Sequence, residues 1–117
     1  MGRLTTHVLD AAQGKPGNNI EIQLYRVEDN QLQLLGSTLT NHDGRCDAPL
    51  LEADAFIPGT YQLHFAVGAY YREQGMMLPD PSFLDVVVLR FGVSAADQHY
   101  HVPLLVSPYS YSTYRGS

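Results

Sequence analysis

The sequence predicts an all-β fold, a sandwich or barrel of about eight short antiparallel strands with one short helix. Three observations support this prediction. Apolar residues recur at every second position along most segments, which is the period of a half-buried strand. Clusters of Gly, Pro, Asn and Asp separate these segments at short intervals, as turns do. A single segment, 68–75, has the pattern of a short helix.

The first expected strands alternate most clearly. Segments 20–27 and 61–67 place apolar residues on one face and mainly polar residues on the other, so each is expected to be half buried. Segment 83–91 is more continuously apolar, which favours a strand that is buried on both faces.

Two further strands are expected near the end, over 99–106 and 109–115. Pro103 lacks a backbone N–H, so it predicts an edge or a bulge in the first of them. The pair Asp43–Gly44 is a hairpin signal. Turns are expected at 13–19, 41–45, 57–60 and 107–110.

Length and composition predict one domain over residues 1–117 with a partner surface. Hydrophobic residues make up 44% of the chain, which is ordinary, but charged residues make up only 16%. Burial against other copies of the chain would explain the low charge, so we expect an oligomer. The net charge of −5 argues against nucleic acid and against an anionic membrane as partners.

Targeting and cysteine patterns favour a reducing, cytoplasmic location. Cys46 is the only cysteine, which excludes an intrachain disulfide and a cysteine-based zinc finger, and a buried spectator thiol is expected there. The sequence has no apolar run long enough to span a bilayer and no apolar segment typical of a secretory signal near residue 1. The terminal tripeptide is not a peroxisomal address.

Histidines are the main candidates for chemistry. His99 and His101 lie two apart on an expected strand, so they face the same way, and His7 lies in another alternating segment. The like-facing pair could share a proton-transfer task or hold a metal ion. His42 and His64 have no such neighbour, and the expected role for them is polar filler.

A metal site remains an alternative for the three histidines. His7, His99 and His101 could form a three-histidine zinc site with one open position. No carboxylate or cysteine accompanies them in a recognised ligand motif, so this interpretation is not favoured.

Two arginines are further candidates. Arg45 follows the Asp43–Gly44 turn, where it is either a solvated flank or a planar fork for an anion or a carbonyl–amide edge. Arg115 lies between Tyr114 and Gly116, in a terminal segment where fraying would be ordinary. The sequence lacks a nucleophile elbow, a P-loop and a dinucleotide fingerprint.

Three stretches together resemble one known family. "LTTHVLD…GKPG" near the start, the T-x-x-DGR pattern at 40–45 and "HYHVPLLVSPYSYSTYRGS" at the end are similar to the 5-hydroxyisourate hydrolases, the transthyretin-like enzymes of urate breakdown. The resemblance spans the whole chain in the same order, and the terminal Tyr-Arg-Gly-Ser is its most specific part.

This resemblance implies a fold, an assembly and a reaction. It implies a transthyretin-like sandwich of two four-stranded antiparallel sheets with one short helix. It also implies a homotetramer, a dimer of dimers, with active sites in the channel between dimers. The implied reaction is hydrolysis of 5-hydroxyisourate to 2-oxo-4-hydroxy-4-carboxy-5-ureidoimidazoline by water attack on a ring lactam carbonyl, with no cofactor and no metal.

The resemblance also assigns the site. The catalytic set falls on His7, Arg45, His101 and Ser117. The substrate-binding set falls on Arg45, Tyr114, Arg115, Gly116, Ser117 and, in a supporting role, His99.

Each residue type suits its task. A neutral imidazole can deprotonate water near pH 7, and which of His7 and His101 does so stays open. Arg45 would hold the polar edge of the ring and stabilise charge on the carbonyl oxygen. Ser117 offers a hydroxyl and the terminal carboxylate, and both remain candidates. The tyrosines and Pro103 would wall the pocket.

Two other classes of function compete with the enzyme. A transthyretin-type carrier would share the fold and bind a hormone in the same channel, but it lacks the histidine–arginine set and the terminal Tyr-Arg-Gly-Ser, both present here. A purely structural tetramer would leave the polar residues of the channel unexplained.

Overall fold

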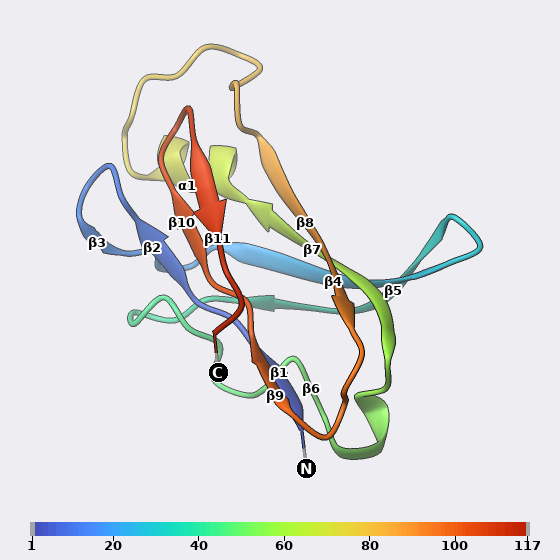
Figure 1. The fold of residues 1–117 in the computed structure, drawn as a ribbon. Helices are drawn as coiled ribbons and strands as arrows, with labels where there is room; N and C mark the ends of the chain where they lie inside the picture. The colour runs from blue at the N-terminus through green and yellow to red at the C-terminus, as the bar shows by residue number, and fades with distance from the viewer. Residues whose placement is uncertain (1, 117) are drawn as a thin grey trace.

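The alternating segments fold into two packed β layers, which the computed structural model describes over residues 2–116 (Figure 1). The first layer is antiparallel throughout, and its strand order is β5-β4-β7-β8. These strands span Gln31–Leu39, Glu21–Glu28, Gly59–Ala66 and Val86–Val93, respectively. The strands that were expected over 20–27 and 61–67 are therefore β4 and β7.

The second layer consists of two pieces, β6-β1-β9 and β11-β10-β2-β3. In chain order its strands are β1 Arg3–Thr5, β2 Val8–Asp10, β3 Lys15–Pro16, β6 Leu51–Glu52, β9 His99–His101, β10 Leu104–Val106 and β11 Tyr111–Thr113. Strand β1 pairs with β9, and β2 with β10, in parallel, so the two ends of the chain lie side by side (Figure 1).

The two pieces of the second layer form one broken sheet. The N–H of Val102 donates to the carbonyl of Thr5 at 2.9 Å, and that of Leu104 donates to His7 at 2.9 Å, so the parallel pairing continues across the gap. The all-β sandwich is therefore confirmed, but its second layer is mixed and interrupted, because both chain ends pass through it in the same direction.

Pro103 lies at this interruption. The prediction of an edge or bulge is replaced by a break between β9 and β10 in the middle of the layer. Proline has no N–H to donate towards β11, and the hydroxyl of Thr113 instead donates to the Pro103 carbonyl at 2.7 Å. The break leaves two short irregular stretches, one between β1 and β2 and one between β9 and β10. His7 lies on the first of them.

The helix predicted over 68–75 is α1, Val67–Glu73, which directly follows β7, and a 3₁₀ turn at Ala53–Ala55 lies before β7. Gly75 follows the helix with φ of +81°, a backbone conformation that favours glycine after a helix end. Among the described residues, no helix is long and apolar enough to cross a membrane.

Asp10 fastens the helix to the second layer. Its carboxylate is fully buried and accepts hydrogen bonds at 2.8 Å from the hydroxyls of Tyr70 and Tyr71. It also accepts from the backbone N–H groups of Ala12 and Gln13 and from the side-chain amide of Gln13. We call these residues the Asp10 cluster.

The core lies between the two layers. It comprises Leu4, Val8, Ile20, Ile22, Leu24, Phe56, Tyr61, Leu63, Phe65, Val67, Tyr70, Tyr71, Val87, Leu89, Val93, Tyr100, Val102, Leu104 and Val106. The expectation of two-sided burial for 83–91 is wrong for the single chain. Val87 and Leu89 are buried, but Val86 and Val88 are 49% and 42% exposed, because no segment among residues 2–116 covers the outer face of this edge strand.

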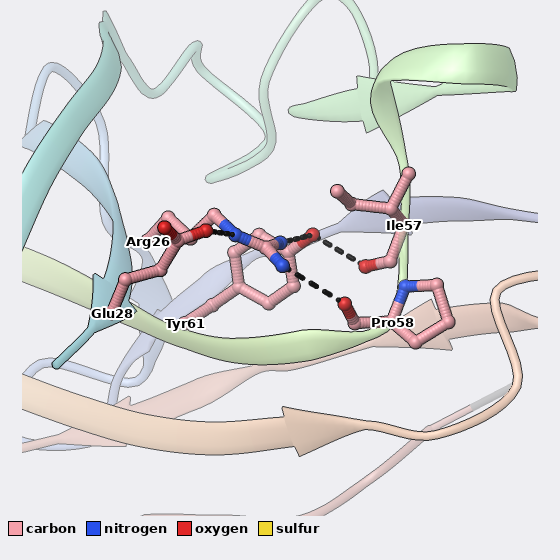
Figure 2. Close-up of polar contacts among 5 residues, drawn as sticks. All are labelled: Arg26, Glu28, Ile57, Pro58 and Tyr61. Carbon is pink, nitrogen blue, oxygen red and sulfur yellow. Dashed lines mark hydrogen bonds and ion pairs between the residues drawn. The ribbon is translucent and has the colours of Figure 1, made fainter.

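A second polar cluster lies in the first layer, between the end of β4 and the turn before β7 (Figure 2). The guanidinium of Arg26 contacts the carboxylate of Glu28 at 2.6 Å and donates to the Tyr61 hydroxyl at 3.0 Å and the Pro58 carbonyl at 3.1 Å. Tyr61 in turn donates to the Ile57 carbonyl at 2.5 Å (Figure 2). These contacts attach the turn before β7 to β4.

Candidate active site

Two histidines meet at the break in the second layer. His7 follows β1, and His101 ends β9, so the parallel pairing brings together residues from opposite ends of the chain. Nδ1 of His7 lies 2.6 Å from Nε2 of His101, and the ring centroids are 4.8 Å apart with the planes inclined by 26°. Two rings with these separations meet edge to edge, in hydrogen-bond geometry.

A threonine extends this pair to a third histidine. The hydroxyl of Thr5 lies 2.8 Å from Nδ1 of His101 and 2.8 Å from Nε2 of His99. Strand alternation explains the grouping, because Thr5 lies two residues before His7 and His99 lies two residues before His101. His7, His101, Thr5 and His99 are thus joined by hydrogen bonds, and we call them the histidine chain.

A tight turn brings Arg45 to the same place. The side-chain oxygen of Asn41 accepts from the N–H groups of Asp43 and Arg45, at 2.9 and 3.2 Å. Gly44 has φ of +74°, and a Cβ there would lie 2.5 Å from the Val8 carbonyl, so the turn requires glycine. The hairpin signal at Asp43–Gly44 therefore corresponds to a tight turn. Arg45, which ends this turn, forms an isolated β-bridge with His7.

The surroundings keep the histidine pair neutral. Burial, followed by the nearby charge of Arg45, lowers the pKa of His7 below its ordinary value. Burial, together with His7, Arg45 and His99, lowers the pKa of His101 to about 4. Near pH 7 the imidazoles of His7 and His101 are therefore uncharged, each with one N–H donor and one acceptor nitrogen.

The C-terminal segment packs on this pair. Gly116 and His101 form an isolated bridge, in which the Gly116 N–H donates to the His101 carbonyl at 2.7 Å. A Cβ on Gly116 would lie 3.2 Å from the His101 side chain, so glycine allows the close approach. The expected strand over 109–115 is shorter, β11, and the segment after it pairs with His101 through Gly116. Ser117 lies outside the described residues.

An open depression of about 570 Å³ covers the histidine chain. Its lining residues are Arg3, Thr5, Thr6, His7, Arg45, Cys46, His99, His101, Tyr114 and Gly116. Arg45 and Tyr114 are exposed to solvent in the single chain. Among the residues described, no carboxylate lines the depression.

Arg115 points elsewhere in the single chain. Its guanidinium stacks over the Tyr100 ring at 3.9 Å and donates to the side chain of Gln98 and the carbonyl of His99. It lines a separate cavity of about 410 Å³ between β8 and β11. The structure thus brings His7, His99, His101, Arg45, Tyr114 and Gly116 together, and turns the Arg115 side chain to the neighbouring cavity.

The metal interpretation finds no support in the arrangement of residues 2–116. No group of three or more His, Cys, Asp or Glu side chains in this range is placed to hold an ion. The inner nitrogens of His7 and His101 are directed at each other, so they are occupied as hydrogen-bond partners.

The remaining histidines lie away from the site. His42 is exposed beside Asp43. His64 contacts Gln62 and the Tyr25 ring on β4 and β7. Cys46 lines the depression, and burial, with the charge of Asp47, raises the pKa of its thiol. The thiol therefore stays protonated near pH 7.

Thr5 was missed by sequence reasoning. The signal was available, because Thr5 and His7 share one face of an alternating segment, but an isolated hydroxyl two residues from a histidine is common. What the sequence hides is the parallel pairing that places Thr5 opposite His101.

Comparisons with known proteins agree on one family. The model of the HIUase/Transthyretin family matches residues 4–116. A protein of Pseudomonas aeruginosa named 5-hydroxyisourate hydrolase is 68% identical over 117 residues, which cover 100% of this chain and 93% of that protein.

Solved structures show the same relationship. The Klebsiella pneumoniae 5-hydroxyisourate hydrolase is 31% identical with a TM-score of 0.82, and the match covers 100% of both chains. An (S)-allantoin synthase is 44% identical with a TM-score of 0.94, and the match covers 99% of this chain but 44% of that longer one.

Proposed function

The chain belongs to the HIUase/transthyretin family, and on this basis we propose that its histidine chain hydrolyses 5-hydroxyisourate. The hydrolase activity follows from 68% identity to the Pseudomonas aeruginosa enzyme over the full length of this chain. The product is 2-oxo-4-hydroxy-4-carboxy-5-ureidoimidazoline, which forms when water adds to a ring lactam carbonyl and the C–N bond opens.

The contact between His7 and His101 carries the proposed mechanism. A lactam carbonyl is a weak electrophile, so water must lose a proton as it attacks. The two imidazoles share a 2.6 Å hydrogen bond and are neutral near pH 7, which is the state that a general base needs. One imidazole accepts the proton and the other sets its tautomer and orientation.

Arg45 supplies the positive charge of the proposed site. It lies beside His7 across the β-bridge and is exposed towards the depression. In that place it binds the polar edge of the ring and stabilises negative charge on the carbonyl oxygen during attack. Tyr114 and Gly116 form the C-terminal wall, and Arg115 and Ser117 remain proposed substrate contacts.

A hormone carrier is not favoured. The family model includes transthyretin, so the fold alone does not decide between catalysis and carriage. The hydrolase relatives and the neutral histidine pair beside an arginine favour the enzyme.

We further propose a homotetramer built as a dimer of dimers. Apolar side chains on the edge strands β8 and β11 are exposed in the single chain, among them Val88 and Tyr111. These strands flank one cavity, as expected for a surface that another copy covers. Light scattering after size-exclusion chromatography tests this, and a monomeric mass would contradict it. A cytoplasmic location stays a prediction for cell fractionation.

The direct test of the activity uses freshly generated 5-hydroxyisourate. Added protein should accelerate the loss of its ultraviolet absorbance over buffer alone, and an unchanged decay would overturn the proposal. An EDTA-treated sample should keep its full rate. Loss of that rate, restored by added zinc, would return the three histidines to the role of metal ligands.

A further inference from the structure

The hydroxyl of Thr5 bridges two histidines that the family-based assignment treats separately. It lies 2.8 Å from His101 Nδ1 and 2.8 Å from His99 Nε2. A hydroxyl has one proton to donate and lone pairs to accept, so it can receive from one ring and give to the other. The neighbouring Thr6 differs, because its buried hydroxyl donates to the Val102 carbonyl at 2.6 Å.

The histidine chain has three internal hydrogen bonds and two outer ends. The outer atoms are Nε2 of His7 and Nδ1 of His99, and neither has a hydrogen-bond partner among residues 2–116. Both histidines line the open depression, where water and substrate have access. The chain therefore connects two separate points of the same pocket.

When all three imidazoles are neutral, counting protons leaves two arrangements for the histidine chain. Each neutral imidazole has one N–H and the threonine has one O–H, so making all three hydrogen bonds leaves one proton at one outer end. In the first arrangement every histidine is the Nδ1–H tautomer, and His7 Nε2 has a free lone pair. In the second every histidine is the Nε2–H tautomer, and the free lone pair is on His99 Nδ1.

We propose that Thr5 is a relay residue that couples His99 to the His7–His101 pair, so that proton uptake at His7 releases a proton at His99. This inference rests on the proposed hydrolysis. It gives His99 a specific task at the far end of the chain.

The proposed step balances. The oxygen of water bonds to the lactam carbon while one water proton passes to His7 Nε2. The Nδ1 proton of His7 moves to His101 Nε2, that of His101 moves to Thr5, and the threonine proton moves to His99 Nε2. The Nδ1 proton of His99 passes through water to the ring nitrogen as the C–N bond breaks. Exchange with solvent then restores the first arrangement.

The charges around the histidine chain favour passing the proton along it over holding the proton on one imidazole. Arg45 from the turn and Arg3 from β1 line the depression, with Cys46 as a protonated thiol. In the part of the chain that the structure describes, no Asp or Glu side chain lines it. Burial and the charge of Arg45 disfavour a positive charge resting on the central His101, and a connected chain avoids it.

The direction follows from Arg45. Its backbone bridges that of His7, and its charge acts on the imidazoles of His7 and His101, so a carbonyl oxygen bound by the guanidinium would lie at the His7 end of the histidine chain. Water attacking that carbonyl is then nearest to His7 Nε2, and His99 is left to release the proton.

The main test replaces the hydroxyl of Thr5. Thr5→Val keeps the shape and removes the bridge, so kcat should fall about tenfold or more with KM little changed. Thr5→Ser keeps a hydroxyl and should recover most of the rate. Thr60→Val is the matched control, because Thr60 lies on β7 in the other layer and outside the depression, and its kcat should stay within about twofold. A Thr5→Val enzyme with wild-type kcat would overturn the relay.

A second measurement depends on neither activity nor a variant. Nitrogen-15 NMR of the histidine rings in the wild-type protein should find the same tautomer on His7, His99 and His101. Opposite tautomers on His99 and His101 would overturn the relay even in an active enzyme. Matched tautomers in a protein without activity would instead contradict the proposed hydrolysis and leave the hydrogen-bonded chain intact.

Discussion

The histidine chain lies along the parallel pair β1 and β9, and Asp10 lies on the next parallel pair of the same layer, β2 and β10, yet the polar groups of the two clusters are satisfied to different degrees. Asp10 is fully buried, and its two oxygens accept five hydrogen bonds from Tyr70, Tyr71, Gln13 and Ala12. The histidine chain is half buried, and among residues 2–116 its two outer nitrogens have no partner. The hydrogen-bonding capacity of the Asp10 carboxylate is thus used up, whereas the histidine chain can still bind another group at each end.

This difference assigns a structural role to the Asp10 cluster and a chemical role to the histidine chain. A saturated carboxylate cannot accept another group, so the Asp10 cluster can only hold α1 against the sheet. The histidine chain keeps one acceptor and one donor free at the pocket, which is what a reacting water requires. If the comparison is right, substitutions in the two clusters should affect different measurements.

The largest expected effect is on catalysis. His101→Asn removes the centre of the histidine chain, so kcat/KM for 5-hydroxyisourate should fall about 100-fold or more. The free energy of unfolding, measured with urea, should change by less than about 1 kcal/mol, because His101 is only half buried. His42→Asn is the matched control, since His42 is exposed away from the site, and it should keep the full rate. Equal kcat/KM for His101→Asn and His42→Asn would contradict the catalytic role of the histidine chain.

The next effect is on stability. Asp10→Asn replaces an acceptor of five hydrogen bonds with an amide that must present N–H groups to donors, and we expect a loss of about 2 to 4 kcal/mol in unfolding free energy. The specific activity of the folded fraction should change little. Urea denaturation at pH 7 measures the first quantity, and a wild-type midpoint would show that the cluster does not fasten the helix.

The pH dependence should separate the clusters further. The pKa of His101 is lowered to about 4 and that of His7 is lowered too, so between the unfolded value of 6.5 and about 4 the unfolded chain binds protons first. Stability should therefore decline over this window as pH falls, and activity should survive below the ordinary imidazole pKa.

The carboxylate acts in a lower window. Burial alone would raise the pKa of Asp10, but hydrogen bonds from Tyr70, Tyr71 and Gln13 outweigh it and lower the pKa below 3.8. Its stabilisation is therefore present above pH 3.8 and lost below it. Stability profiles of the two variants test both windows, since His101→Asn should flatten the upper decline and Asp10→Asn the lower.

The smallest effect belongs to the Arg26 cluster of Figure 2. Glu28 is 62% exposed, so Glu28→Gln should cost less than about 1 kcal/mol in unfolding free energy and leave kcat unchanged. Thermal denaturation is sufficient to measure it. A larger loss would mean that this ion pair, and not only the buried Tyr61, holds the turn before β7.

Local patterns in the sequence predict what is decided within one chain segment. Alternation over 20–27 and 61–67 identified β4 and β7, because each buries one face against the core of the same chain. The same reasoning failed for 83–91, where the outer face of an edge strand stays exposed in the single chain.

The site was only partly accessible to such patterns. The His-x-His spacing placed His99 and His101 on one face, and the resemblance added His7 and Arg45. Thr5 stayed hidden, because its role depends on pairing between residues almost a full chain length apart. Non-local pairing of this kind leaves no periodic signal in either strand.

That pairing has a consequence for synthesis of the protein. The contacts that build the histidine chain join residues 94 to 96 positions apart, so the site has no internal geometry until β9 has emerged and packed on β1. During translation, the N-terminal strands must wait for their partners, and contacts of such long range form slowly. A nascent chain therefore becomes able to catalyse the reaction only after β9 has been made and has packed on β1.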